Sequence, residues 1–387
     1  MKYPKISIDL SRFNWAIENS DVDKKTIFDI FPKLGDWISG NDKPTMRELS
    51  DFSLKTHIPI GYFFLKNPPK EEHIELLKYR TIQSHKSSTI SKNLRDTVLQ
   101  MTNIQDWMRK YFITYEKAQN SFVASLKNVT SVELMSNFIR NNLNIEVDWF
   151  TKNSDPSKNF KFLRSKIQKL NIIVMMNGIV GSNTKRSLNI EEFRAFTMID
   201  YYAPLIFINA KDSSTGRIFS LMHELTHVAI GENSLFNAGI NSDIQSCGDI
   251  EKICNAVAAE ILIPIELFKD QWEKNKNEVN EQKIISNLAS HFKVSKIAIA
   301  RRAYDQKLII KDVYNFYDNK TPNINEPKKS KGGNSYKTFL SRFDENFLKI
   351  INKCVRTGYL LYTDAYGLTG VNRTFFDNVM NKLNTLD

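Results

Sequence analysis

The sequence is poor in cysteine, glycine and proline, and it contains no long apolar run. Three cysteines in 387 residues are too few, and odd in number, for a disulfide framework, which is typical of a reducing compartment. The 14 glycines and 11 prolines leave little room for extended low-complexity sequence. No stretch approaches the ~20 apolar residues of a transmembrane helix, and the first residues lack the apolar core of a signal peptide. We therefore expect a soluble, cytoplasmic protein with no membrane partner.

The positive charge is unevenly distributed. The formal net charge is +11, yet residues 1–66 hold ten basic and nine acidic side chains, a net charge of only +1. The excess lies downstream, in segments such as 78–95 and 328–337. Basic patches neutralise phosphates, but lysines scattered over solvated helix faces also raise the isoelectric point. Scattered surface lysines are the favoured explanation of the net positive charge, and a polyanion-binding surface is the alternative.

Apolar periodicity divides the chain into five parts. Residues 1–68 predict a helical domain, with one helix within residues 24–42 and a capping box formed by Thr45 and Glu48. Residues 69–165 predict a helical connecting region. Residues 166–317 predict a domain with strands within 171–180, 191–199 and 203–210, followed by helices around 219–231 and 249–264. A polar linker at 318–335 and a small helical region at 336–387 complete the chain. The predicted class is α+β and mostly helical.

Two of the six histidines lie four residues apart in the segment FSLMHELTHVAIG, which spans residues 219–231. On a helix, His223 and His227 project side by side and can bind one divalent ion, for which Zn²⁺ suits nitrogen ligands. Glu224 lies ~100° around the helix, where it can take a proton from an attacking water and pass one to a leaving amine. This is the HExxH arrangement of zinc peptidases. The structural alternative, two ordinary histidines of a helix, is disfavoured by the glutamate between them.

A catalytic zinc needs a third protein ligand and one open position. The downstream acids are Glu232, Asp243, Asp249, Glu251 and Glu260. Glu251 and Glu260 lie on opposite sides of one helix, so they cannot both face one metal. We favour Glu251, with Asn255 on the same face as a group that orients a ligand. Geometry alone does not settle this choice, and a carboxylate ligand keeps Mn²⁺ possible.

The segment from Glu192 to Gly231, followed by IEKICNAVAAEILIP at 250–264, resembles the ImmA/IrrE family of metallo-endopeptidases. Weaker similarity extends over nearly the whole chain. The family pattern, HExxH and then a Glu ahead of an Asn and a small-residue run, falls here on Glu251 and Asn255. The resemblance implies a zincin-like domain with a small sheet, preceded by a helix-turn-helix domain of the XRE type.

The resemblance also implies a substrate and a way to bind it. In zinc proteases of this build, the strand before the HExxH helix runs along the cleft. Leu205, Ile206, Phe207 and Ile208 are therefore expected to pair with an extended substrate backbone. Typical family targets are transcriptional repressors, so we expect a repressor or partner regulator from a prophage, stress-response or toxin–antitoxin or defence system.

One alternative function remains open. The chain could be a regulator that binds DNA or protein and retains the metal site only as a scaffold. Its N-terminal module is nearly neutral and has Pro32 and Gly35 where a helix that reads a DNA groove needs continuous backbone. Docking to a protein is therefore favoured over DNA binding, which we expect to be weak.

Overall fold

The computed structural model describes residues 4–20, 22–67, 90–152, 155–236, 248–276, 280–318 and 334–384. Two compact units divide the chain: Met1–Ile74 with Thr89–Arg95, and Glu75–Ser88 with Asp96–Asp387. Helices dominate, and strands occur in the second unit, which confirms the α+β, mostly helical class.

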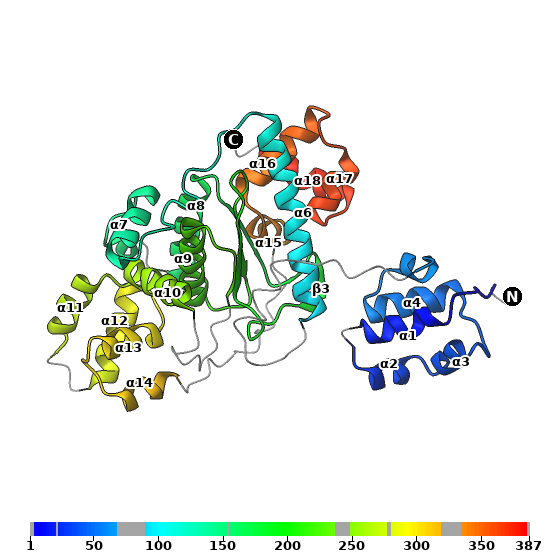
Figure 1. Cartoon of the computed structure of the whole chain (residues 1–387), viewed down its shortest axis with the longest axis horizontal. Coiled ribbons are helices and arrows are strands. Elements are labelled where there is room, and N and C mark those ends of the chain that lie inside the picture. The colour runs from blue at the N-terminus through cyan, green and yellow to red at the C-terminus, as the bar shows by residue number, and fades with distance from the viewer. Residues whose placement is uncertain are drawn as a thin grey trace. The chain divides into compact units, whose positions relative to one another are not determined.

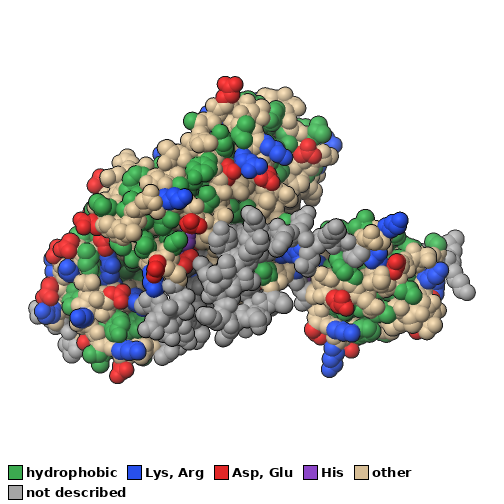
Figure 2. Space-filling view, viewed as in Figure 1, with side chains coloured by type: hydrophobic (Ala, Val, Ile, Leu, Met, Phe, Trp, Pro, Cys, Tyr) green, Lys and Arg blue, Asp and Glu red, His purple; other side chains and the backbone are tan. Residues whose placement is uncertain are grey.

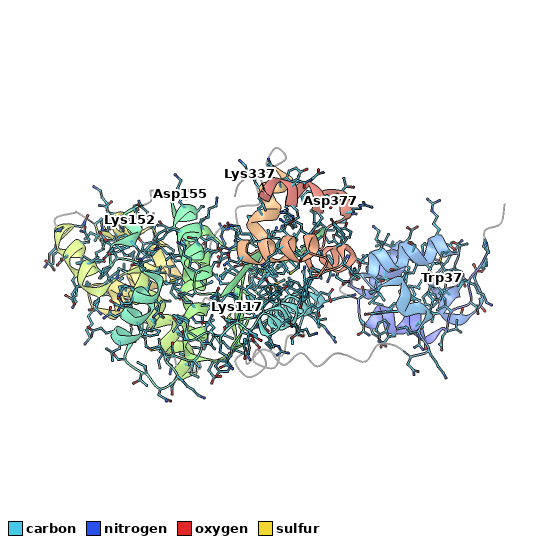
Figure 3. The ribbon with its side chains drawn as sticks, turned by 90° about the horizontal axis from the view of Figure 1, so that it is seen from above. Trp37, Lys117, Lys152, Asp155, Lys337 and Asp377 are labelled. Carbon is cyan, nitrogen blue, oxygen red and sulfur yellow. The ribbon has the colours of Figure 1, made fainter. Side chains whose placement is uncertain are left out.

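The N-terminal unit is helical around an aromatic centre. Its elements are α1 (Ser11–Glu18), α2 (Lys24–Ile30), α3 (Leu34–Ser39), α4 (Met46–Thr56) and the 3₁₀ helix η1 (Ile60–Phe64). Phe13, Trp37 and Phe52 are buried and pack against one another, and Figure 3 labels Trp37 among these helices. The capping box of Thr45 and Glu48 is confirmed.

The single helix expected within residues 24–42 is in fact two, α2 and α3. Phe31 ends α2 with φ −120° and ψ 78°, because the ring of Pro32 disfavours the helical conformation of the residue before it. Pro32 and Lys33 then lead into α3. The exposed positions of α3 are Gly35, Asp36 and Ser39, none of which is basic.

A four-stranded sheet forms the centre of the second unit, in the order β1-β5-β4-β6. Strands β1 (Ile173–Asn177) and β5 (Leu205–Asn209) are parallel, whereas β4 (Ala195–Met198) is antiparallel to both β5 and β6 (Ser234–Phe236). Strands β2 (Ile179–Val180) and β3 (Asn183–Ser187) form a separate hairpin. The expected strands are confirmed, whereas β3 and β6 were not predicted.

Helices cover both faces of this sheet. Figure 1 shows α8 (Pro156–Gln168) and α9 (Ser214–Ile230) on one face and α6 (Lys92–Thr114) on the other. Gln105 of α6 donates hydrogen bonds to the carbonyls of Met198 and Ala203, at 2.8 and 3.0 Å. Against α9 packs α10 (Asp249–Leu262), which also contacts α7 (Val132–Leu143).

The remaining helices belong to the same unit. They are η2 (Trp149–Lys152), α11 (Ile265–Lys274), α12 (Glu281–Phe292), α13 (Lys296–Asp305), α14 (Lys311–Asp318), α15 (Ser335–Arg342), α16 (Glu345–Arg356), α17 (Tyr362–Thr369) and α18 (Arg373–Asn384). The C-terminal helices are joined to the sheet through Arg164, whose guanidinium donates to the carbonyls of Ser341, Phe343 and Val174. Asp344 accepts a hydrogen bond from the Val174 amide at 3.0 Å. This region is therefore part of the unit that holds the sheet.

The surface carries both signs of charge. Figure 2 shows Lys and Arg side chains interspersed with Asp and Glu over the visible face, with no continuous basic patch among the described residues seen there. Within the described ranges, no helix combines the length and apolarity that crossing a membrane requires.

Candidate metal centre

Helix α9 is fixed at both ends. The Ser213 hydroxyl accepts a hydrogen bond from the Gly216 amide and caps the first turn. The helix ends at Gly231, which has φ +87° and donates to the His227 carbonyl at 2.8 Å. A side chain at Gly231 would meet Ala124 at 2.7 Å, so both backbone angle and space require glycine there.

Three side chains converge where α9 faces α10. The Nε2 atoms of His223 and His227 lie 3.2 Å apart, and each lies 3.1 Å from a different carboxylate oxygen of Glu251. The three residues are at most 6% exposed. They form the group of potential metal ligands found among the described residues, with ligand atoms within 4.8 Å of one another.

These separations fit a small cation held at the centre of the group. With metal–ligand distances near 2.0–2.1 Å and tetrahedral angles, neighbouring ligand atoms lie about 3.4 Å apart. The observed 3.1–3.2 Å separations are close to that edge length. Two imidazole nitrogens and one carboxylate occupy three corners, which leaves a fourth direction for a water or a substrate oxygen.

Asn255 orients one of the imidazoles. It lies one turn after Glu251 on α10, and its Oδ1 lies 3.0 Å from Nδ1 of His223. If Nδ1 carries the proton and donates to this oxygen, the lone pair of Nε2 points into the group. The site thus includes an outer hydrogen bond of the kind that metal-binding histidines usually make.

Glu224 is held by the sheet. Its Oε2 accepts a 2.6 Å hydrogen bond from the Thr197 hydroxyl of β4 and another from the Ser234 hydroxyl of β6. The other oxygen, Oε1, is buried and has no hydrogen-bond partner among the described residues. One carboxylate oxygen is therefore anchored while the other is free to accept a proton.

No pattern in the sequence selects Thr197 or Ser234. Hydroxyl residues are common in strands, and neither lies near the histidines at a helical or strand spacing. Ser234 also lies on β6, a strand that was not predicted.

The electrostatics of the group favour a positive charge at its centre. Burial lowers the pKa of His227, but the neighbouring Cys254 and Glu251 side chains outweigh burial and hold that pKa well above its ordinary value of 6.5. Burial raises the pKa of Glu251, but hydrogen bonds and charge from His223 and His227 outweigh it and lower the pKa well below 4.5. The raised pKa of His227 and the lowered pKa of Glu251 both mean that the Glu251 carboxylate stabilises a cation beside it.

The other candidate ligands lie apart from this group. Glu260 forms an ion pair with Arg302 and accepts a hydrogen bond from the Ile265 amide, at the start of α11. The Asp249 side chain is 94% exposed and pairs with Lys252. Glu232 is not part of the group, and Asp243 lies outside the described residues.

The prediction that Leu205–Ile208 pair with substrate is wrong. These residues belong to β5, whose backbone pairs with β1 on one side and β4 on the other. All its residues are buried. An internal strand has no free edge to offer an extended peptide, and its run of apolar residues is typical of a strand buried on both faces.

Comparison with known proteins supports the metal-dependent interpretation. Residues 169–304 match the peptidase M78 family model, described as the IrrE N-terminal-like domain. The match includes the sheet, the histidine helix and Glu251. No curated protein and no solved structure matches the chain. Residues 169–304 are therefore a zincin-like metallopeptidase domain of the ImmA/IrrE family.

Proposed function

We propose that the protein is a zinc-dependent endopeptidase. His223, His227 and Glu251 would hold the metal, and Glu224 would act as general base and then general acid. The convergence of two Nε2 atoms and one carboxylate within 3.1–3.2 Å carries this proposal. Zn²⁺ suits two imidazoles and a carboxylate, and Mn²⁺ is the alternative.

The protein side chains have distinct tasks in peptide hydrolysis. When bound, the metal would supply a Lewis acid that polarises a carbonyl and favours hydroxide over water. Glu224, anchored through Oε2, would take the proton of the attacking water on its free oxygen Oε1. It would then deliver that proton to the leaving amine. Asn255 would keep His223 in the tautomer that presents Nε2.

The substrate we propose is a protein, because family targets are proteins. A transcriptional repressor or a partner regulator of a prophage, stress-response or toxin–antitoxin or defence system is the most specific candidate. The support for this choice is the resemblance described for the sequence. A cytoplasmic location would give access to such a target.

The test compares cleavage by wild type, Glu224→Gln and a control, Glu266→Gln, which changes a carboxylate that is exposed on α11. Each is incubated with denatured casein and with a candidate repressor, with and without a chelator. We expect cleavage by wild type and Glu266→Gln that the chelator stops and added Zn²⁺ restores. Glu224→Gln should retain zinc, measured by elemental analysis, and cleave neither protein.

The alternative function is a non-proteolytic regulator that retains the metal site as a scaffold. It shares the ligand group but gives Glu224 no chemical role. Zinc binding with no cleavage of either protein by wild type would support it. Cleavage that Glu224→Gln leaves intact would overturn the endopeptidase mechanism.

A further inference from the structure

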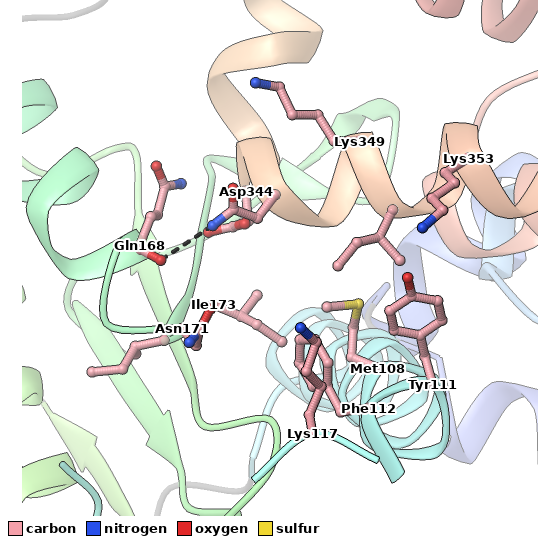
Figure 4. Close-up of a pocket in the computed structure, with 13 residues that line it drawn as sticks. Met108, Tyr111, Phe112, Lys117, Gln168, Asn171, Ile173, Asp344, Lys349 and Lys353 are labelled. Carbon is pink, nitrogen blue, oxygen red and sulfur yellow. Dashed lines mark hydrogen bonds between the residues drawn. The ribbon is translucent and has the colours of Figure 1, made fainter. Parts of the chain in front are cut away.

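A cavity lies away from the metal group, where α6, the end of α8, the start of β1 and α16 meet. Its volume is about 350 Å³, within the range of small-molecule sites. None of its lining residues belongs to the candidate metal centre. Figure 4 shows this cavity with its lining side chains.

The floor of the cavity is apolar. Met108 and Phe112 come from α6, Ile173 is the first residue of β1 with Ile172 directly before it, and Ile350 comes from α16. Ile172 and Ile173 are almost fully buried. Such a surface favours the aromatic or aliphatic body of a ligand, because burying apolar area is favourable without requiring directed contacts.

The rim is cationic. Lys117, which follows α6, and Lys353 of α16 line the cavity, and neither forms an ion pair within the described parts of the chain. Figure 4 shows them approaching the cavity from different elements, with the Tyr111 hydroxyl on the Lys353 side. Lys353 also lies 5.9 Å from the centre of the Tyr115 ring. Two unpaired ammonium groups beside a hydroxyl favour an anionic head group.

The acidic residues nearby are already engaged. Asp344 itself lines the cavity, and its buried carboxylate accepts hydrogen bonds from the amides of Val174 and Phe347, with the charge of Arg164 also acting on it. Glu345 pairs with Lys349, another lining residue, at 3.0 Å. Neither carboxylate forms an ion pair with Lys117 or Lys353.

We propose that this cavity binds a small amphipathic anion, with an aromatic or aliphatic body and a carboxylate, sulfonate or phosphate head. The apolar floor takes the body, and Lys117, Lys353 and Tyr111 take the head. The site is independent of the proposed peptidase function.

The test uses 1-anilinonaphthalene-8-sulfonate as a probe of this chemistry. Its neutral counterpart, N-phenyl-1-naphthylamine, has the same rings without the charge. Fluorescence titration and calorimetry on the full chain should give one site for the sulfonate, with affinity that falls as salt rises. The neutral probe should bind about tenfold more weakly.

Variants distinguish this cavity from other apolar surfaces. Lys117→Met combined with Lys353→Met retains the apolar stems and should weaken sulfonate binding about tenfold while leaving the neutral probe unchanged. Lys127→Met, at an exposed position of the same unit, should change nothing. Ile350→Trp should block both probes by filling the cavity. Circular dichroism and thermal unfolding establish that each variant is folded.

Equal binding of the two probes, several sulfonate sites per chain, or unchanged binding in the folded Ile350→Trp variant would each overturn the proposal. If the double lysine variant fails to fold, Ile350→Trp and the comparison of the two probes still decide the outcome. Because no activity is measured, failure here leaves the endopeptidase proposal untouched.

Discussion

The Thr197 hydroxyl donates a 2.6 Å hydrogen bond to Oε2 of Glu224. Thr197 lies on β4 and Glu224 on α9, so this contact joins the sheet to the helix of the HExxH motif. Ser234 donates to the same oxygen from β6. Because hydrogen bonds to a charged acceptor are strong and directional, the two hydroxyls hold the carboxylate in one orientation and leave Oε1 free.

Replacing Thr197 with Val should slow catalysis without removing the metal. The substitution preserves shape but removes a hydrogen bond to a carboxylate, which contributes about 1.5–3 kcal/mol and corresponds to a tenfold or larger loss of kcat. We expect little change in KM, because Thr197 contacts the base and not the ligand group. Steady-state cleavage assays measure kcat and KM, and elemental analysis measures the zinc content.

The conservative variant Thr197→Ser is the matched control, since it retains a hydroxyl at the same atom position. It should recover most of the lost kcat. If Thr197→Ser and Thr197→Val are equally slow, packing and not the hydrogen bond is responsible. Loss of zinc from Thr197→Val would assign the residue to the stability of the site.

Asn255→Ala should weaken metal binding. The Oδ1 atom of Asn255 lies 3.0 Å from Nδ1 of His223, and loss of such an outer hydrogen bond typically lowers metal affinity by about 10–100-fold. Competition with a fluorescent zinc chelator measures the affinity directly. Asn141→Ala, at an exposed position of α7, is the control. An unchanged zinc affinity in Asn255→Ala would show that His223 needs no such support.

The effect of pH on stability should reverse when the metal is added. In the metal-free protein, the raised pKa of His227 means that its pairing stabilises fully below pH 6.5 and is lost as pH rises through the raised value. The lowered pKa of Glu251 means that its pairing is present above pH 4.5 and is lost only as pH falls toward the lowered value. This group therefore stabilises the metal-free fold most between these two pH values.

Metal binding has the opposite dependence, because it requires neutral imidazoles. We expect the increase in melting temperature on adding Zn²⁺ to grow from about pH 5.5 to about pH 8. Differential scanning calorimetry at fixed zinc concentration measures this increase. The double variant His223→Ala with His227→Ala should lose both the pH-dependent stabilisation of the metal-free fold and the increase in melting temperature on adding Zn²⁺. A zinc-induced increase that shrinks as pH rises would contradict binding through these imidazoles.

The sequence predicts the histidine pair well because that geometry is local, whereas the choice of Glu251 on the next helix also drew on the resemblance to the ImmA/IrrE family. The spacing of His223 and His227 fixes their directions on any helix, and α10 needed only to place Glu251 on the facing side. The anchors of Glu224 come from strands whose pairing is long-range, so no local pattern marks Thr197 or Ser234. The position of β5 was predicted by analogy, although its uninterrupted apolar run already favoured an internal strand.

The C-terminal helices should be required for the stability of the peptidase fold. The buried Arg164 guanidinium donates to the carbonyls of Ser341 and Phe343 at 2.7 and 2.6 Å, and to Val174 of β1 at 2.7 Å. Arg164→Met leaves these buried carbonyls without a donor, so we expect the free energy of unfolding to fall by about 3 kcal/mol. Urea denaturation measures the loss, with Lys161→Met, at an exposed position of the same helix, as the control. An equal effect of the two substitutions would mean that α15 and α16 are not held to the sheet through Arg164.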